Sequence, residues 1–270
     1  MKFDLHTHHF RCGHASGNIR DYIESAISSG LQVIGISDHT PFFGREEEQA
    51  FPLISMAKSE LSSYVQEVLE LQKEYSGVID VLLGIESDYF PIHAELYRKT
   101  LAAYPFDYII GSVHQVEDIS IFNANRWKKL NDTQQIAVKK EYYRMIQESA
   151  RSGMFQILGH IDAMKGNYPR FSDIIAHEEI DETLRVIAAC NVAIEINTSG
   201  KTKQSGGWYP SDTILERAYY FGVDVTFGSD AHKPERVGEE LLEVSTRLKE
   251  IGFKEWVYYK QKQKQVVPLL

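Results

Sequence analysis

The chain has 270 residues, of which 43% are apolar and 25% are charged, which is the composition of an ordinary soluble globular protein. Its two cysteines cannot form a disulfide framework and suit a reducing cytoplasm, and its formal net charge of −9 disfavours broad binding to nucleic acid or anionic lipid. No apolar run approaches the roughly 18 residues of a membrane span, and the first residues lack a signal-peptide pattern, so disordered, secreted, fibrous and membrane classes are excluded.

Short apolar runs alternate with longer amphipathic segments along the chain. In chain order we expect strands over 2–5, 31–36, 78–85, 108–110, 155–158, 192–196 and 223–227, and helices over 19–29, 56–75, 92–103, 132–152, 178–189, 211–221 and 238–251. Alternation of this kind predicts an α/β fold with a parallel sheet. Seven such units favour a closed barrel, and because no linker interrupts the pattern we expect one domain over 1–270.

Each expected strand is followed by imidazole, carboxylate or amide side chains. In chain order these are His6 and His8, Asp38 and His39, Glu86, His114, His160 and Asp162, Glu195 and Asn197, and Asp230 and His232. Because the carboxyl ends of parallel strands converge at one end of a barrel, we expect these side chains to gather there. Imidazole and carboxylate groups brought together in this number predict a metal site.

Seven of the ten histidines are candidate metal ligands: His6, His8, His14, His39, His114, His160 and His232. His6 and His8 are two residues apart, so both side chains would lie on the same face of a strand and could bind one ion. The other three, His9, His93 and His177, end no expected strand and are interpreted as structural or surface residues.

Among the acidic residues, Glu86 ends a buried apolar run, where a charge is costly unless it is paired or bound to metal. One carboxylate can bridge two cations, and Asp230 would offset further charge. Glu195 could point into the barrel or form a structural ion pair, whereas Asp4 and Asp162 are expected in supporting roles. Cys12 could be a soft ligand, although a small buried thiol is the interpretation we favour.

The motifs that contain these residues resemble those of the polymerase-and-histidinol-phosphatase (PHP) family. They are Asp4–His8, Ser37–His39, Gly84–Glu86, Gly111–His114, Gly159–Asp162 and Gly228–His232, and the resemblance runs from Met1 to about Gly252. The segments 104–108, 111–114 and 195–200 are similar to the stand-alone histidinol-phosphatase branch, which acts late in histidine biosynthesis. The resemblance implies a distorted TIM-like (β/α)7 barrel that holds three divalent transition-metal ions.

The family's ligand pattern can be placed on this chain position by position. The resemblance implies a first metal held by His6, His8, Glu86 and Asp230, a second by Glu86, His114 and His160, and a third by His14, His39 and His232. Glu86, Asp230 and His39 are the residues expected to act most directly in catalysis. Imidazole and carboxylate ligands suit Zn, Fe and Mn alike.

The reaction implied is hydrolysis of a small phosphorylated metabolite, most directly L-histidinol phosphate. Hydroxide held between two cations would attack phosphorus, because divalent metals lower the pKa of water toward about 7. Arg170, Lys201 and Lys203 follow the fifth and sixth strands and are candidates to bind phosphate, with ordinary surface charge as the alternative for each. Arg11 and Arg236 are weaker candidates. Where the branch often has an Arg-Lys pair, this chain has Lys201-Thr202-Lys203.

Two other classes of protein also fit part of the pattern. An amidohydrolase opens with the same His-x-His motif, but its two-metal forms often use a modified lysine as the bridge, and no expected strand here ends in lysine. A nuclease or non-catalytic module, as found in DNA polymerases, is opposed by the charge of −9. We therefore expect a cytoplasmic enzyme without nucleic-acid or membrane partners. The oligomeric state stays open, and the aromatic tail at Trp256, Tyr258 and Tyr259 either covers the barrel or frays.

Overall fold

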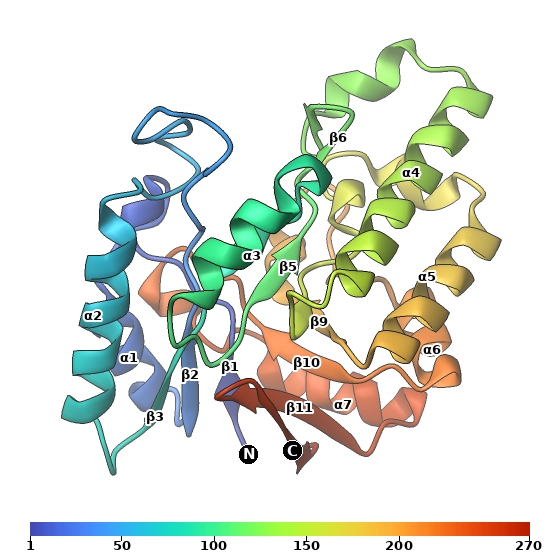
Figure 1. Ribbon diagram of the computed structural model, residues 1–270. Helices are drawn as coiled ribbons and strands as arrows, with labels where there is room; N and C mark the ends of the chain where they lie inside the picture. The colour runs from blue at the N-terminus through green and yellow to red at the C-terminus, as the bar shows by residue number, and fades with distance from the viewer.

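Two parallel sheets form the centre of the molecule in the computed structural model, which describes residues 1–270 (Figure 1). The first contains β1 (Phe3–Asp4), β2 (Val33–Ile36) and β3 (Asp80–Leu83) in that order. The second contains β10 (Val225–Gly228), β9 (Ala193–Asn197), β8 (Ile157–Leu158), β5 (Ile110–Ser112) and β4 (Glu86–Asp88). All neighbouring strands within these two sheets are parallel, as the sequence predicts.

The two sheets meet on both sides. On one side β3 and β4 are a single run of chain, interrupted only at Gly84 and Ile85. On the other side the backbone N–H of Leu5 donates to the carbonyl of Phe227 at 3.2 Å, and that of His8 donates to the carbonyl of Ala231 at 2.9 Å. These hydrogen bonds join the continuations of β1 and β10, so seven strand positions follow one another around a ring. The expected α/β fold with parallel strands is confirmed.

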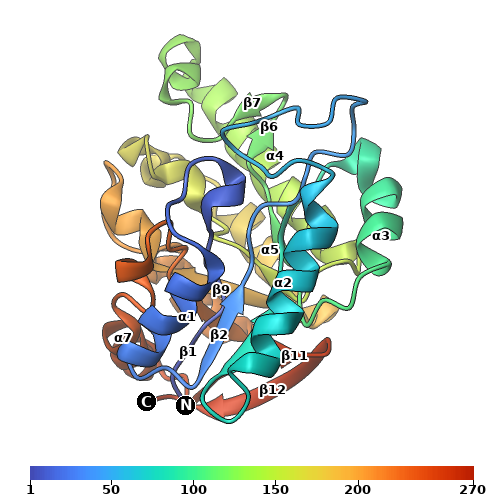
Figure 2. The ribbon, with the colours of Figure 1, turned by 90° about the vertical axis from the view of Figure 1, so that its left-hand side faces the viewer.

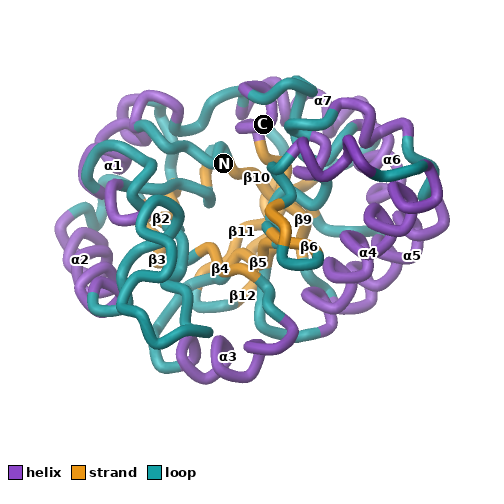
Figure 3. Tube along the Cα trace, turned by 90° about the horizontal axis from the view of Figure 1, so that it is seen from above, coloured by secondary structure: helices purple, strands orange, loops and turns teal.

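The helices lie outside the strands (Figure 3). They are α1 (Ile19–Ser28), α2 (Glu60–Glu74), α3 (Ala94–Ala102), α4 (Asp132–Arg151), α5 (His177–Cys190), α6 (Asp212–Phe221) and α7 (Leu241–Ile251). Each corresponds to an expected helix, with ends that differ by up to four residues. In α1 the buried residues Ile19, Tyr22, Ile23 and Ala26 recur at helical spacing, which places one apolar face against the strands. None of the helices combines the length and apolar character needed to cross a lipid bilayer.

The interior of the barrel is tied together by a tyrosine. Tyr108 is fully buried, and its hydroxyl donates to the carbonyl of Leu5 at 2.5 Å, across the ring from its own strand. A Cβ at Gly35 or at Gly84 would collide with the Tyr108 side chain. Glycine is therefore required at both positions for the ring of strands to close around this side chain.

The amino end of the barrel is covered by the last residues of the chain. There β11 (Glu255–Lys260) and β12 (Gln263–Pro268) form an antiparallel hairpin (Figure 2). Trp256 is fully buried, with its ring 4.9 Å from that of Phe3. The aromatic tail thus covers the barrel rather than fraying. A second, smaller hairpin, β6 (Gln115–Val116) with β7 (Ile119–Ser120), follows β5 at the other end.

Candidate metal centre

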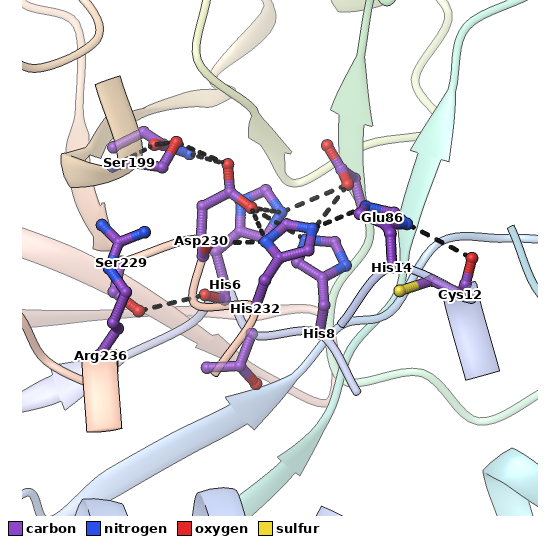
Figure 4. Close-up of polar contacts among 12 residues, drawn as sticks. His6, His8, Cys12, His14, Glu86, Ser199, Ser229, Asp230, His232 and Arg236 are labelled. Carbon is purple, nitrogen blue, oxygen red and sulfur yellow. Dashed lines mark hydrogen bonds and ion pairs between the residues drawn. The ribbon is translucent and has the colours of Figure 1, made fainter. Parts of the chain in front are cut away.

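All nine residues that the sequence predicts as metal ligands lie together at the carboxyl end of the strands. They are His6, His8, His14, His39, Glu86, His114, His160, Asp230 and His232, and several of them are drawn in Figure 4. Their positions follow from the fold, because eight of them lie in loops that follow strands and Glu86 begins β4 directly after β3. Residues separated by more than 200 positions in the chain, such as His6 and Asp230, thereby become neighbours, with 3.8 Å between His6 Nε2 and Asp230 Oδ1.

Glu86 occupies the middle of this cluster and is almost fully buried. Its Oε2 lies 2.8 Å from His39 Nδ1 and 3.3 Å from His6 Nε2. Its Oε1 lies 3.0 Å from His160 Nε2 and accepts a hydrogen bond of 2.6 Å from the Ser112 hydroxyl. One carboxylate thus faces imidazoles from three different strands, which is the placement a bridging ligand needs.

Asp230 is the second carboxylate of the cluster. Its Oδ1 lies 3.0 Å from His8 Nε2, while its Oδ2 accepts hydrogen bonds from the Ser199 hydroxyl at 2.9 Å and from Asn197 Nδ2 at 3.2 Å. The contacts from the end of β9 therefore fix one oxygen and leave the other facing the imidazoles.

The remaining imidazoles face each other in pairs. His114 Nε2 lies 3.3 Å from His160 Nε2, and His14 Nε2 lies 2.8 Å from His232 Nε2. Two neutral imidazole lone pairs at such distances require a proton or a cation between them. Together with His6 and His8, whose rings are 4.9 Å apart, the cluster contains three pairs of imidazoles arranged around two carboxylates.

A carboxylate contacts the far ring nitrogen of three of these imidazoles. His6 Nδ1 lies 2.6 Å from Glu195 Oε1, His8 Nδ1 lies 3.2 Å from Asp38 Oδ1, and His114 Nδ1 lies 3.0 Å from Asp88 Oδ1. Partners of this kind fix the tautomer and orientation of metal-binding histidines.

Glu195 therefore points into the barrel, which decides between the two alternatives that the sequence leaves open. Its Oε2 also accepts from the backbone N–H of His160 at 3.1 Å and from Asn197 Nδ2 at 3.0 Å. Gly228 leaves the space that this carboxylate occupies, because a Cβ there would collide with Glu195 Oε1. Asp4 has the expected supporting role, since its carboxylate accepts from the backbone N–H groups of His6, Ser229 and Gly238.

Burial and neighbouring charges act in opposite directions at the two central carboxylates. Burial alone would raise the pKa of Glu86, but the imidazoles of His39, His6 and His114 outweigh it and hold that pKa well below its usual range. Asp230 is held ionised in the same way, by His6 and His8. Burial and the neighbouring His8 lower the pKa of His232 to about 3. Burial would lower the pKa of His8 and of His114, but neighbouring carboxylates outweigh it and raise both to about 9, so metal binding there would release protons as the imidazoles become neutral ligands.

A cavity of about 600 Å³ opens directly onto the cluster. Its lining includes His14, His39, Glu86, His114, His160, Asp230 and His232, so the candidate ligands form part of its wall. The cavity is large enough for a small metabolite.

Comparison with known proteins agrees with this arrangement. The family model that describes the PHP domain matches residues 4–199. The chain belongs to the PHP family. Among its relatives, a probable histidinol-phosphatase of Deinococcus radiodurans is 30% identical over 254 residues, covering 92% of this chain and 93% of the relative. The histidinol-phosphatase of Bacillus subtilis is 30% identical over 263 residues, covering 88% and 96%.

A solved structure has the same fold as this PHP chain. It is a histidinol phosphate phosphatase from Lactococcus lactis in complex with zinc, L-histidinol and phosphate. The two structures superpose with a TM-score of 0.81 at 22% sequence identity, and the match covers 98% of each chain.

Two of the three cations expected to bind phosphate lie elsewhere in the PHP chain. Arg170 is exposed on a short 3₁₀ helix at Pro169–Asp173 and does not line the cavity. The Lys201 ammonium lies 2.7 Å from Glu240 and 3.1 Å from Glu239, so acidic residues after β10 neutralise it. Lys203 does line the cavity, with its ammonium 5.9 Å from the centre of the Phe122 ring.

Arg236, which the sequence ranks as a weaker candidate, also lines the cavity. Glu239 accepts from its Nε at 2.7 Å and fixes the guanidinium in place. The aromatic part of the wall, formed by Phe42, Phe51 and Phe90, was not predicted from the sequence. Phe42 and Phe51, in the long loop after β2, are the sequence signal that could have indicated it.

His9 and Cys12, which lie in or next to the first motif, make contacts typical of residues with a structural role. His9 is fully buried, with Nδ1 2.9 Å from Asp38 Oδ2, whereas His8 contacts the other oxygen of that carboxylate. The Cys12 thiol is buried and donates to the carbonyl of His9 at 3.2 Å. Burial raises the pKa of Cys12, which keeps it a neutral thiol and agrees with the packing role.

Proposed function

We propose that this PHP protein is a metal-dependent phosphomonoesterase that hydrolyses L-histidinol phosphate to L-histidinol and phosphate. The observation that carries the proposal is the cluster of seven imidazoles and two carboxylates at the wall of a cavity of metabolite size. Relatives at 30% identity that span nearly the whole chain are histidinol-phosphatases, which supports the choice of substrate.

The residues present fit divalent cations. His6 Nε2, His8 Nε2 and Glu86 Oε2 are buried, and although other candidate ligands lie close to them, none of the three makes a hydrogen bond of proper geometry. His6, His8 and Glu86 offer ligand atoms within 4.8 Å of one another. Unpartnered buried polar atoms are costly, so a cation among them would satisfy all three. His39, Glu86 and His114 form a second group of this size, and His8, His39 and His232 form a third.

We infer three ions, since the cluster offers three pairs of imidazoles. His6, His8, Glu86 and Asp230 would hold the first; Glu86, His114 and His160 the second; and His14, His39 and His232 the third. The donor set is compatible with Zn, Fe or Mn. The zinc in the Lactococcus lactis structure favours zinc as the first metal to test.

Bound divalent cations would lower the pKa of water toward about 7 and offset the charge of a phosphate dianion. The chain's own residues supply the rest. Glu86 would be shared between two metal positions, and Asp230 and His39 would complete the ligand set nearest the cavity. Ser199 and Asn197 hold the Asp230 carboxylate in place. Lys203 presents positive charge from the cavity wall, where phosphate oxygens need donors, and Arg236 lies there as a donor that is paired with Glu239.

The central position of Glu86 argues against the amidohydrolase alternative. A modified-lysine bridge requires a lysine where the cluster has its shared carboxylate, and Glu86 fills that place.

The test combines elemental analysis with a substrate screen. We expect several transition-metal ions per chain in protein purified without chelators, and turnover of L-histidinol phosphate far faster than that of p-nitrophenyl phosphate. A sugar or nucleotide monophosphate turned over much faster than L-histidinol phosphate would remove the histidine-pathway assignment. A correctly folded chain that neither contains nor takes up metal would refute the proposal that the protein is a metal-dependent enzyme.

A further inference from the structure

Apart from the candidate metal ligands, the cavity has charged side chains of opposite sign on opposite walls. Lys203 and Arg236 come from the loops after β9 and β10. Asp88, which also lines the cavity, is the last residue of β4. In the ring of strands, β4 is three positions away from β9 and from β10, so the carboxylate stands across the barrel mouth from the two cations.

Asp88 presents an oxygen that the protein does not use. Its Oδ1 lies 3.0 Å from His114 Nδ1 and accepts from the His114 backbone N–H at 3.2 Å. Its Oδ2 has no hydrogen-bond partner, no lysine or arginine pairs with the carboxylate, and its side chain is 24% exposed. The second oxygen is therefore available to a molecule in the cavity.

Beside Asp88 the wall is aromatic. The Phe42 ring lies 5.2 Å from that of Phe51 and 5.1 Å from that of Phe90, both edge to face, and all three line the cavity. At the rim Leu53 and Ile54 are 72% and 55% exposed. This wall offers contact to a flat, weakly polar group, and such contact would bury apolar surface that otherwise faces water.

A free carboxylate would repel a substrate whose only charge is a phosphate dianion. The same carboxylate would attract a substrate with phosphate at one end and a positive charge at the other, and the cations across the barrel mouth would orient it. We propose that Asp88, together with Phe42, Phe51 and Phe90, forms a subsite for a leaving alcohol that carries an ammonium group beside a flat ring, with Asp88 accepting the ammonium. This inference rests on the proposed function, since L-histidinol has both groups.

The test is Asp88→Asn in the metal-loaded enzyme, because asparagine keeps an oxygen for His114 and loses the charge. A hydrogen bond to a charged group is strong enough to predict an increase of about tenfold or more in KM for L-histidinol phosphate and in the inhibition constant of L-histidinol. Because Asp88 also contacts His114, the decisive readout is a difference between substrates: kcat/KM for L-histidinol phosphate should fall about tenfold or more relative to that for p-nitrophenyl phosphate, and the inhibition constant of L-histidinol should rise more than that of inorganic phosphate, since p-nitrophenyl phosphate and inorganic phosphate lack an ammonium. Glu47→Gln, at an exposed residue outside the cavity lining, is the matched control for charge and should change neither the kinetics with the two substrates nor the two inhibition constants.

Equal losses on both substrates would show that Asp88 acts only through His114, and no loss on either would show that it contacts no substrate; each result overturns the proposal. If the wild-type enzyme does not hydrolyse L-histidinol phosphate, the proposed function fails separately. The Asp88 subsite is then tested with phosphoethanolamine and ethyl phosphate, which differ in an ammonium two carbons from the ester oxygen. Wild-type preference for phosphoethanolamine that disappears in Asp88→Asn would support the subsite, and its persistence would refute it.

Discussion

Replacing Glu195 with glutamine tests whether the carboxylates behind the imidazoles set metal affinity. The Glu195 carboxylate contacts His6 Nδ1 through one oxygen and accepts from His160 N–H and Asn197 Nδ2 through the other. A glutamine amide has only one oxygen, so it can accept either from His6 or from His160 N–H and Asn197 Nδ2, but not from both. If its oxygen faces His6, its NH2 faces two donors, which costs about 2–6 kcal/mol at about 1–3 kcal/mol for each unsatisfied group.

The opposite orientation of the amide is therefore favoured. It keeps both hydrogen bonds to the glutamine oxygen and directs an N–H at His6 Nδ1, which forces the proton of His6 onto Nε2. That nitrogen faces Glu86 and Asp230, where it would donate in the metal-free protein but could not bind metal. We expect metal affinity to fall about 10–100-fold, or about 1.4–2.7 kcal/mol, with little change in the melting temperature of the metal-free chain.

Chelator competition measures the metal affinity, and calorimetry of the metal-free protein measures stability. Glu182→Gln on α5 is the control, since Glu182 forms only an exposed pair with Arg185. Wild-type metal affinity and kcat in Glu195→Gln would refute the reasoning. So would a large loss of stability in the metal-free state, because it would show that the amide had not reoriented.

Three other predictions concern the shared carboxylate, the cavity lysine and a buried lysine on α4. Glu86→Gln should lower kcat by about 10³-fold or more without unfolding the chain, since it removes the shared charge; circular dichroism checks the fold, and wild-type turnover at full metal loading would contradict the bridging role. Lys203→Ala should raise KM about tenfold. Lys201→Ala should leave KM unchanged, because Lys201 is already paired with acidic residues. The reverse result would indicate that Lys201, and not Lys203, binds the substrate. Burial lowers the pKa of Lys139 from its usual 10.5 to about 8, so the folded state binds fewer protons than the unfolded chain between these values. The free energy of unfolding should therefore rise with pH from about 8 to 10.5 relative to Lys139→Met, as measured by urea titration, and a parallel dependence in both proteins would contradict this.

The candidate ligands could be predicted from the sequence because two simple rules act on them. Parallel strands end at the same edge of a barrel, and residues two apart on a strand share a face. These rules suffice for His6, His8 and Glu86, which lie on or directly after strands. They do not show which imidazoles face each other, so the His14–His232 and His114–His160 pairs required the structure.

The cations were harder to place for an electrostatic reason. Arg170, Lys201 and Lys203 all follow strands and are indistinguishable by position. What separates Lys201 from Lys203 is a pair of glutamates nearly 40 residues further along the chain, Glu239 and Glu240. Pairing over such a distance in sequence leaves no local pattern.

The two hairpins escaped prediction because their turns lack the usual residues. A two-residue hairpin turn with positive φ at both central positions ordinarily has Asn-Gly or Asp-Gly. Here Gln261 and Lys262 have φ of 51° and 60°, and Glu117 and Asp118 have φ of 54° and 59°. Burial of Trp256 against Phe3 stabilises the first hairpin despite this strain, so tertiary packing outweighs local preference.

Tertiary packing also explains why the barrel mouth can contain buried carboxylates and imidazoles, which would destabilise an ordinary hydrophobic core. Glu86 is almost fully buried, and the imidazoles that compensate its charge include a pair whose ring nitrogens face each other, His114 and His160. A hydrophobic core of 70 buried residues offsets that cost elsewhere in the molecule. Because cations would satisfy both the carboxylate and the paired nitrogens, metal binding and stability should be linked, and the residues least favourable for folding are those on which the chemistry depends.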